Sequence, residues 1–160
     1  MKKLLLIRHA EAVSSSNDGD MGRQLSARGE ADVQALVQKL QATGNVPQYF
    51  VSSPSVRTIK TATTLAQQLG APSPLLAPAI YEASEKALLK TINHFSDQYD
   101  FVAMVGHNPG IAYLLLNLTE KVRDVLPCTA ILVVFEDVDS WQEVTHGSGV
   151  ITYYTTPGHS

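Results

Sequence analysis

The stretch KLLLIRHA at residues 3–10 decides how the chain is expected to fold. After Lys3 come four large apolar residues, and the run ends directly at the polar pair Arg8-His9. A short, unbroken apolar run of this kind is typical of a strand that is buried on both faces, as in a parallel sheet. We therefore predict a buried first strand over residues 3–7, with two polar side chains just beyond its carboxyl end.

Short apolar runs alternate with segments of helical period along the rest of the chain. This alternation favours an α/β fold, a three-layer α/β/α sandwich with a mostly parallel central sheet. Helices are expected at residues 26–41, capped by Ser26, at 54–69, capped by Ser53, at 85–95, capped by Ser84, and after Asn108-Pro109. Further strands are expected at residues 49–52, near 75–76, at 101–105, and in a terminal hairpin of 130–135 and 141–145.

Composition limits the kind of protein that this sequence describes. Its 160 residues are 44% apolar and 17% charged, which fits a single domain over residues 1–160. The 12 lysines and arginines are scattered and the net charge is −3, so we do not expect a nucleic acid partner. The lone Cys128 is interpreted as a packing residue in a reducing compartment. Because the apolar run before Arg8 is too short for a secretion signal or a membrane span, the expected location is the cytoplasm, away from membranes.

Polar motifs follow three of the predicted strands. They are Arg8-His9, residues 53–57 with Arg57, and residues 106–109 with His107. The carboxyl ends of parallel strands meet at one edge of a sheet, where the following helices present their N-termini. Two arginines and two histidines are therefore expected together. Guanidinium groups offer planar pairs of donors, so this group of residues suits a doubly charged tetrahedral anion.

Each of these motifs matches a pattern of one enzyme family. LIRHA at residues 6–10 resembles the first motif of this family, Arg-His-Gly, with Ala10 in place of glycine. SSP at 52–54, with Arg57 and Thr61-Ala62, resembles the second motif of the family, and GH at 106–107 resembles the third. The sequence thus resembles the histidine phosphatase superfamily. NP at 108–109, RQLS at 23–26 with Gly29 and the short length are most similar to its SixA-like phosphohistidine phosphatases. The resemblance runs from Leu4 to at least Leu116 and implies a small phosphoglycerate mutase-like fold without a lid insertion.

The resemblance implies a role for each matching residue. His9 would be the catalytic nucleophile that carries a phosphoryl group transiently. Arg8, Arg57 and His107 would bind the phosphoryl oxygens and offset the charge that develops on them. The chemistry needs His9 without its proton, and neighbouring arginines disfavour the imidazolium, so we predict a lowered pKa for His9.

Three further residues are weaker matches. Glu82 is the nearest match to the carboxylate that acts as general acid in larger family members, and it is equally well explained as a solvated residue near a helix start. Arg23 is interpreted either as structural or as shaping the entrance to the site. Asn108 is a candidate substrate contact, although an N-cap is the simpler interpretation.

The predicted function is that of a phosphatase that needs no metal or cofactor. Protein phosphohistidine is the expected substrate class, because a site without a lid is open to a protein surface and imidazole is a good leaving group. Two alternatives remain, a phosphatase for a small phosphorylated metabolite and a noncatalytic phosphate-binding module. His94, His146 and His159 match no motif and are interpreted as structural or surface residues, and residues 18–20 as a polar loop rather than a metal site.

Overall fold

A computed structural model describes residues 1–158, so the interpretation of His159 lies outside the described residues. The strands are β1 (Lys2–Arg8), β2 (Tyr49–Ser52), β3 (Leu75–Leu76), β4 (Phe101–Gly106), β5 (Ala130–Phe135) and β6 (Val150–Thr155). The α-helices are α1 (Ala27–Thr43), α2 (Val56–Leu69), α3 (Glu85–Asn93) and α4 (Gly110–Thr119). Three short 3₁₀ helices are η1 (Asp20–Gly22), η2 (Pro78–Ile80) and η3 (Trp141–Glu143).

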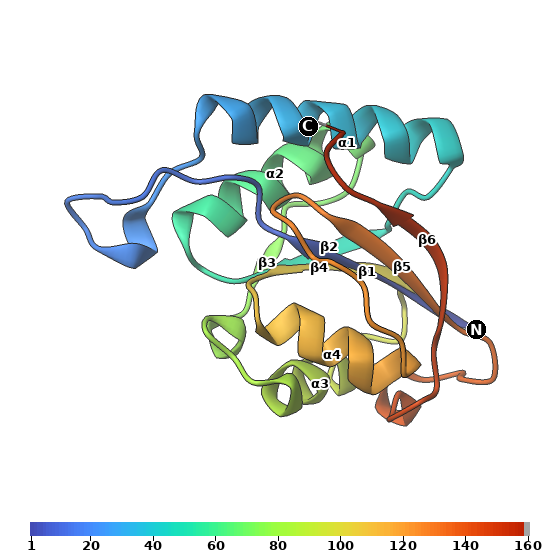
Figure 1. The fold of residues 1–160 in the computed structure, drawn as a ribbon. Helices are drawn as coiled ribbons and strands as arrows, with labels where there is room; N and C mark the ends of the chain where they lie inside the picture. The colour runs from blue at the N-terminus through green and yellow to red at the C-terminus, as the bar shows by residue number, and fades with distance from the viewer. Residues whose placement is uncertain (159–160) are drawn as a thin grey trace.

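The six strands form one sheet in the order β3-β2-β4-β1-β5-β6. The pairs β3–β2, β2–β4 and β4–β1 are parallel, and β5 and β6 join antiparallel at the other side. Figure 1 shows α1 and α2 on one face of the sheet and α3 and α4 on the other. The predicted three-layer sandwich with a mostly parallel sheet is therefore confirmed.

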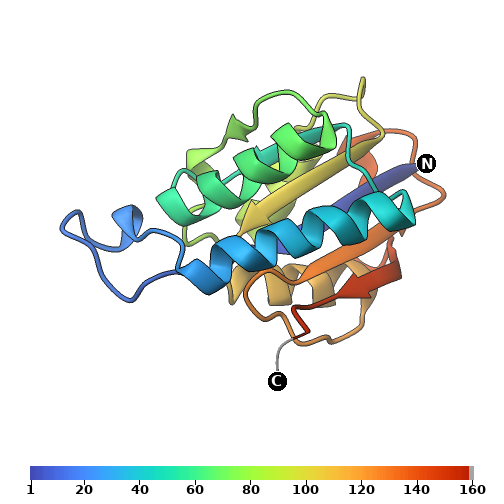
Figure 2. The ribbon, with the colours of Figure 1, turned by 90° about the horizontal axis from the view of Figure 1, so that it is seen from above.

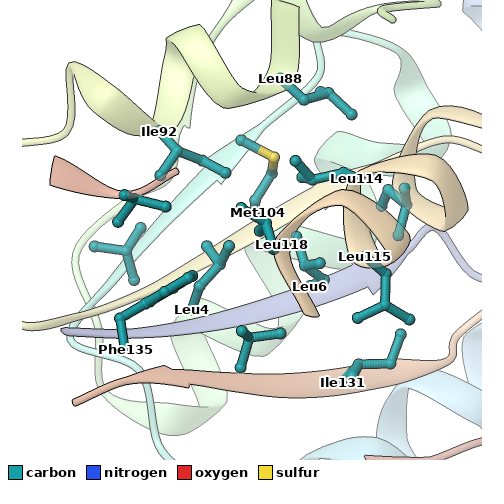
Figure 3. Close-up of a cluster of buried hydrophobic side chains, with 14 of the residues drawn as sticks. Leu4, Leu6, Leu88, Ile92, Met104, Leu114, Leu115, Leu118, Ile131 and Phe135 are labelled. Carbon is teal, nitrogen blue, oxygen red and sulfur yellow. The ribbon is translucent and has the colours of Figure 1, made fainter. Parts of the chain in front are cut away.

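The first strand lies inside the sheet and is buried on both faces, as the apolar run predicts. Leu4 and Leu6 pack in the core on the α3 and α4 side, which Figure 3 shows. Leu5 and Ile7 point the other way, into the core under α1 and α2. Alternation of side chains along a strand means that a run buried on both faces must be apolar at every position.

Three helices begin at serine caps. The side chains of Ser26 and Ser84 accept hydrogen bonds from Gly29 N and Ala87 N, so both predicted caps are confirmed. The predicted cap of α2 is wrong, because Ser55, not Ser53, accepts from Thr58 N, and the helix starts at Val56. This shift of two residues leaves the Ser53 side chain free for another contact, described below.

The predicted second strand of the terminal hairpin, at residues 141–145, is also wrong. Residues 141–143 form η3, because Ser140 and Glu143 make a capping box that favours a helical turn. The Trp141 side chain is fully buried, and its indole N–H donates to Tyr99 O at 2.8 Å. The strand that follows β5 in the sheet is β6, which comes after the turn at residues 146–147.

The segment between β1 and α1 projects beyond the sheet, at the end opposite to the N-terminus in Figure 2. Its base is tied together by Val13 N donating to Gln24 O at 2.8 Å. Gly29 of α1 lies so close to this base that a β-carbon there would come within 2.0 Å of Glu11 O. In residues 1–158, no helix is long and apolar enough to cross a membrane.

Candidate active site

The turns that follow β1, β2 and β4 meet at one edge of the sheet, because these three strands are neighbours. In the parallel registers, Arg8 lies opposite Gly106 and Ser52 lies opposite Val105. The backbone continues this alignment past the strand ends, since His9 N donates to Gly106 O at 3.1 Å. The residues that follow β1, β2 and β4 are therefore placed side by side.

A pocket of about 710 Å³ opens at this edge. It is lined by every residue that the sequence singles out for a site, namely Arg8, His9, Arg23, Arg57, Glu82, His107 and Asn108, and also by Asp20, Ala83, Ser84, Glu85, Pro109, Gly110 and Tyr113. The N-terminal residues of α3 and α4 are among them. Helix N-termini carry partial positive charge, so the pocket favours anions.

His9 is held in one orientation by its neighbour in the chain. Its side chain is only 7% exposed, and Nδ1 lies 2.8 Å from the carbonyl oxygen of Ala10. A carbonyl oxygen can only accept, so Nδ1 carries the hydrogen and, in the neutral ring, Nε2 carries the lone pair. Ala10 has no positive φ, which explains why alanine is acceptable in place of glycine.

The pKa of His9 is lowered to about 4, as predicted, although the main cause is different. Burial has the largest effect, and the charges of Arg57 and Arg8 make smaller contributions. The hydrogen bond to Ala10 acts in the opposite direction. At neutral pH the ring is therefore uncharged and has a free lone pair on Nε2.

His107 lies between Ser53 and Arg57. Its Nε2 is 2.7 Å from Ser53 Oγ, and its Nδ1 is 3.3 Å from Arg57 Nη2. Because a guanidinium can only donate, Nδ1 accepts and Nε2 donates to Ser53 in this arrangement. Burial, followed by the charge of Arg57, lowers the pKa of His107 to about 4.

The two arginines are anchored by other parts of the chain. Arg8 donates through Nη1 to Val125 O at 3.0 Å. Arg57, only 5% exposed, donates through both terminal nitrogens to Asp20. In both side chains the Nε–H group is buried and has no hydrogen-bond partner among the described residues. Both arginines line the pocket, so each guanidinium is held in a fixed place at its wall.

Asn108 and Ser53 do not act as the predicted caps. The N-cap of α4 is Pro109, which makes no side-chain capping bond. The Asn108 amide instead donates to Val125 O at 2.9 Å, the carbonyl that also holds Arg8. Asn108 therefore helps to fix the wall of the pocket next to Arg8.

Glu82 and Arg23 approach the pocket from different segments. Glu82 is exposed and has a φ of 51°, a left-handed backbone conformation that glutamate rarely adopts. Arg23 donates to Val13 O at 2.7 Å and to Asp20 Oδ1 at 3.0 Å. Arg23 thus stabilises the projecting segment at the entrance to the pocket.

Asp20 is the site residue that the sequence analysis missed. Residues 18–20 do form a polar loop and turn, but Asp20 accepts hydrogen bonds from Arg57, Arg23 and Tyr81. These bonds hold the pKa of the Asp20 carboxyl well below its usual range, with the Tyr81 hydroxyl as the largest cause. The only hint in the sequence is that Asp20 lies three residues before Arg23, where the segment that resembles the family begins.

The fold and the pocket together define a small α/β phosphatase. The model of the histidine phosphatase superfamily (branch 1) matches residues 4–85, slightly more than half of the chain. The chain belongs to this superfamily. No curated protein matches it in sequence.

Solved structures with the same fold cover nearly the whole chain. SixA from Nakamurella multipartitia, named as a phosphohistidine phosphatase, is 19% identical with a TM-score of 0.85, covering 99% of this chain and 97% of that one. SixA from Agrobacterium tumefaciens is 16% identical with a TM-score of 0.82 and 98% coverage of both chains. A phosphoserine phosphatase from Entamoeba histolytica, in complex with 3-phosphoglyceric acid, is 17% identical with a TM-score of 0.68, covering 99% and 98%. At these identities the likeness establishes the fold.

Proposed function

We propose that the protein hydrolyses protein phosphohistidine through a phosphoryl group carried transiently on His9. The observation that carries the proposal is the hydrogen bond from His9 Nδ1 to Ala10 O. It leaves the Nε2 lone pair free in a buried, uncharged ring, next to two arginines and a second histidine. A simple binding site for phosphate would gain nothing from a neutral imidazole held in this way, whereas a nucleophile requires it.

In the first step, the Nε2 lone pair of His9 attacks phosphorus and forms a P–N bond. The bond between phosphorus and the leaving group breaks at the same time, and the leaving group takes its electron pair. Arg8 and Arg57 stabilise the negative charge on the phosphoryl oxygens through guanidinium donors. His107 joins them once it has gained a proton, which a bound anion favours by raising the pKa of His107.

In the second step, a water oxygen attacks phosphorus and the P–N bond to His9 breaks. The electron pair returns to Nε2, one water proton is released, and the product is inorganic phosphate. The hydrogen bond from Nδ1 to Ala10 O persists through both steps. It stabilises the positive charge of the phosphorylated ring and keeps Nε2 aimed at the pocket.

The substrate class follows from the leaving group. The imidazole of a substrate phosphohistidine has an ordinary pKa of about 6.5, so it leaves without strong help from an acid. Glu82 lines the pocket and is our candidate for giving a proton to poorer leaving groups. Protein substrates also suit the pocket position, because it lies beside the projecting segment, whose Asp20 and Arg23 line it.

The proposal is tested by measuring phosphate release in the presence of a chelator. A phosphohistidine-carrying protein, an artificial aryl phosphate and a panel of metabolite monoesters are compared for the wild type and His9→Ala. We expect turnover that is fastest on phosphohistidine and lost in His9→Ala. Preference for one metabolite would replace the proposed substrate by that ester, and phosphate binding without any turnover would make the chain a binding module.

A further inference from the structure

Asp20 holds one end of the Arg57 guanidinium with two different oxygens. Arg57 Nη1 donates to the backbone carbonyl of Asp20 at 2.7 Å, and Nη2 donates to carboxylate Oδ2 at 3.0 Å. Two parallel hydrogen bonds to one residue fix the plane of a guanidinium as well as its position. Asp20 belongs to η1, so this contact joins the projecting segment to α2.

The Nε–H donor of the same guanidinium has no acceptor among the described residues. Nε is buried without a partner among residues 1–158, and Nη2 also reaches His107 Nδ1 at 3.3 Å. A buried donor without an acceptor costs free energy, so it indicates either strain or an unfilled binding position. Arg57 and His107 both line the pocket, so a phosphoryl oxygen bound there would lie beside the Arg57 guanidinium.

Asp20 is itself held from two sides. Its Oδ1 accepts from Arg23 Nη1 at 3.0 Å, and its Oδ2 accepts from the Tyr81 hydroxyl. Although 42% of its side chain is exposed, it therefore has a defined orientation. A carboxylate beside a phosphate site repels the substrate, so the presence of Asp20 there needs a compensating role.

From this geometry we infer that Asp20 is a positioning residue for Arg57. It ties down the end of the guanidinium formed by Nη1 and Nη2, and thereby fixes the orientation in which Arg57 lines the pocket. Arg23 and Tyr81 keep Asp20 in place. This inference rests on the proposed function of the pocket and adds a residue outside the matching motifs.

The opposite hypothesis is that Asp20 merely occupies the place of the phosphate. The two hypotheses predict opposite signs for the same substitution. If Asp20 positions Arg57, Asp20→Ala weakens binding of inorganic phosphate, because the guanidinium loses its alignment. If Asp20 competes with phosphate, Asp20→Ala removes repulsion and tightens binding.

The experiment is calorimetric titration of the protein with inorganic phosphate, combined with kinetics on an artificial aryl phosphate. We expect Asp20→Ala to weaken phosphate binding roughly tenfold and to lower kcat more than it raises KM, since Arg57 acts on the transition state. Asp20→Asn keeps an acceptor oxygen for Arg57 and should recover most of both losses. Asp18→Asn, an exposed residue of the same segment, is the matched control and should equal the wild type.

Thermal unfolding of each variant separates loss of alignment from loss of fold. Unchanged or tighter phosphate binding in a folded Asp20→Ala protein overturns the inference, as does a wild type that binds no phosphate. Absence of His9-dependent turnover overturns the proposed function instead. Because phosphate binding is measured without turnover, the two failures are distinguishable.

Discussion

Ser53 Oγ and His107 Nε2 lie 2.7 Å apart, next to the pocket that His107 lines. Both atoms belong to turns that follow parallel strands, and the Ser53 side chain is fully buried. This hydrogen bond fixes the ring of His107 with Nδ1 toward Arg57. It exists because the cap of α2 is Ser55, which leaves Ser53 free to contact the histidine.

We predict that Ser53→Ala lowers kcat/KM roughly tenfold, because His107 loses the partner that orients it. The stability loss should be about 1 kcal/mol, as for one buried hydrogen bond. Ser52→Ala is the matched control, since Ser52 is equally buried and its hydroxyl donates to Ser53 O rather than to a site residue. Steady-state kinetics and urea unfolding measure both effects. Equal activity losses in the two variants would contradict an orienting role for Ser53.

Stability should fall on acidification because of the buried histidines. The pKa of His9 in the folded protein is about 4, below its ordinary value of 6.5, so the unfolded chain binds the proton first as pH falls. The stability that the uncharged His9 ring contributes is fully present above pH 6.5 and is lost between pH 6.5 and about 4. For His9 the loss is at most about 3 kcal/mol. Urea unfolding at several pH values should show this slope, and His9→Asn should reduce it; identical slopes would refute the assignment.

The same pKa sets the acid limit of catalysis. The proposed mechanism requires the uncharged ring of His9, so kcat/KM should fall as pH drops through about 4. A pH profile on the artificial aryl phosphate measures this limit. An acid limb near the ordinary histidine pKa of 6.5 would show that burial does not act on His9 as the structure indicates.

Gly29→Ala should destabilise the protein, although alanine normally favours a helix over glycine by about 1 kcal/mol. The new β-carbon would overlap Glu11 O at 2.0 Å and push the projecting segment away from α1. A loss of about 1–3 kcal/mol is expected from such overpacking, with lower activity because Asp20 moves with the segment. Gly158→Ala has open space around the β-carbon and serves as the control. Unchanged unfolding of Gly29→Ala would be inconsistent with the close approach.

Cys128 should be unreactive in the folded protein. Burial raises the pKa of its thiol to about 12, and the thiolate is the reactive form. We expect no labelling by a disulfide reagent at pH 8 until urea unfolds the chain, after which the single cysteine should react fully. Rapid labelling of native protein would disprove this packing role.

The parts of the site that could be predicted from sequence are those with a local pattern. Arg8-His9 and Gly106-His107 each stand at the end of an apolar run. The apolar run therefore predicts the strand, and the polar motif marks where the strand ends. The position of Asp20 has no such pattern, because it depends on how the whole segment between β1 and α1 folds back toward α2. The strand predicted at residues 141–145 is a 3₁₀ turn in the structure, and the turn buries Trp141 and Val144 in the core.

The sheet order has a consequence for a chain that is still being synthesised. His9 emerges from the ribosome early, but its partner turns belong to β2 and β4, and β4 ends at Gly106. Until β4 inserts between β1 and β2, the arginines and histidines are far apart and no anion site exists. A nascent chain should therefore gain the ability to bind phosphate in one late event, when its central strand is in place.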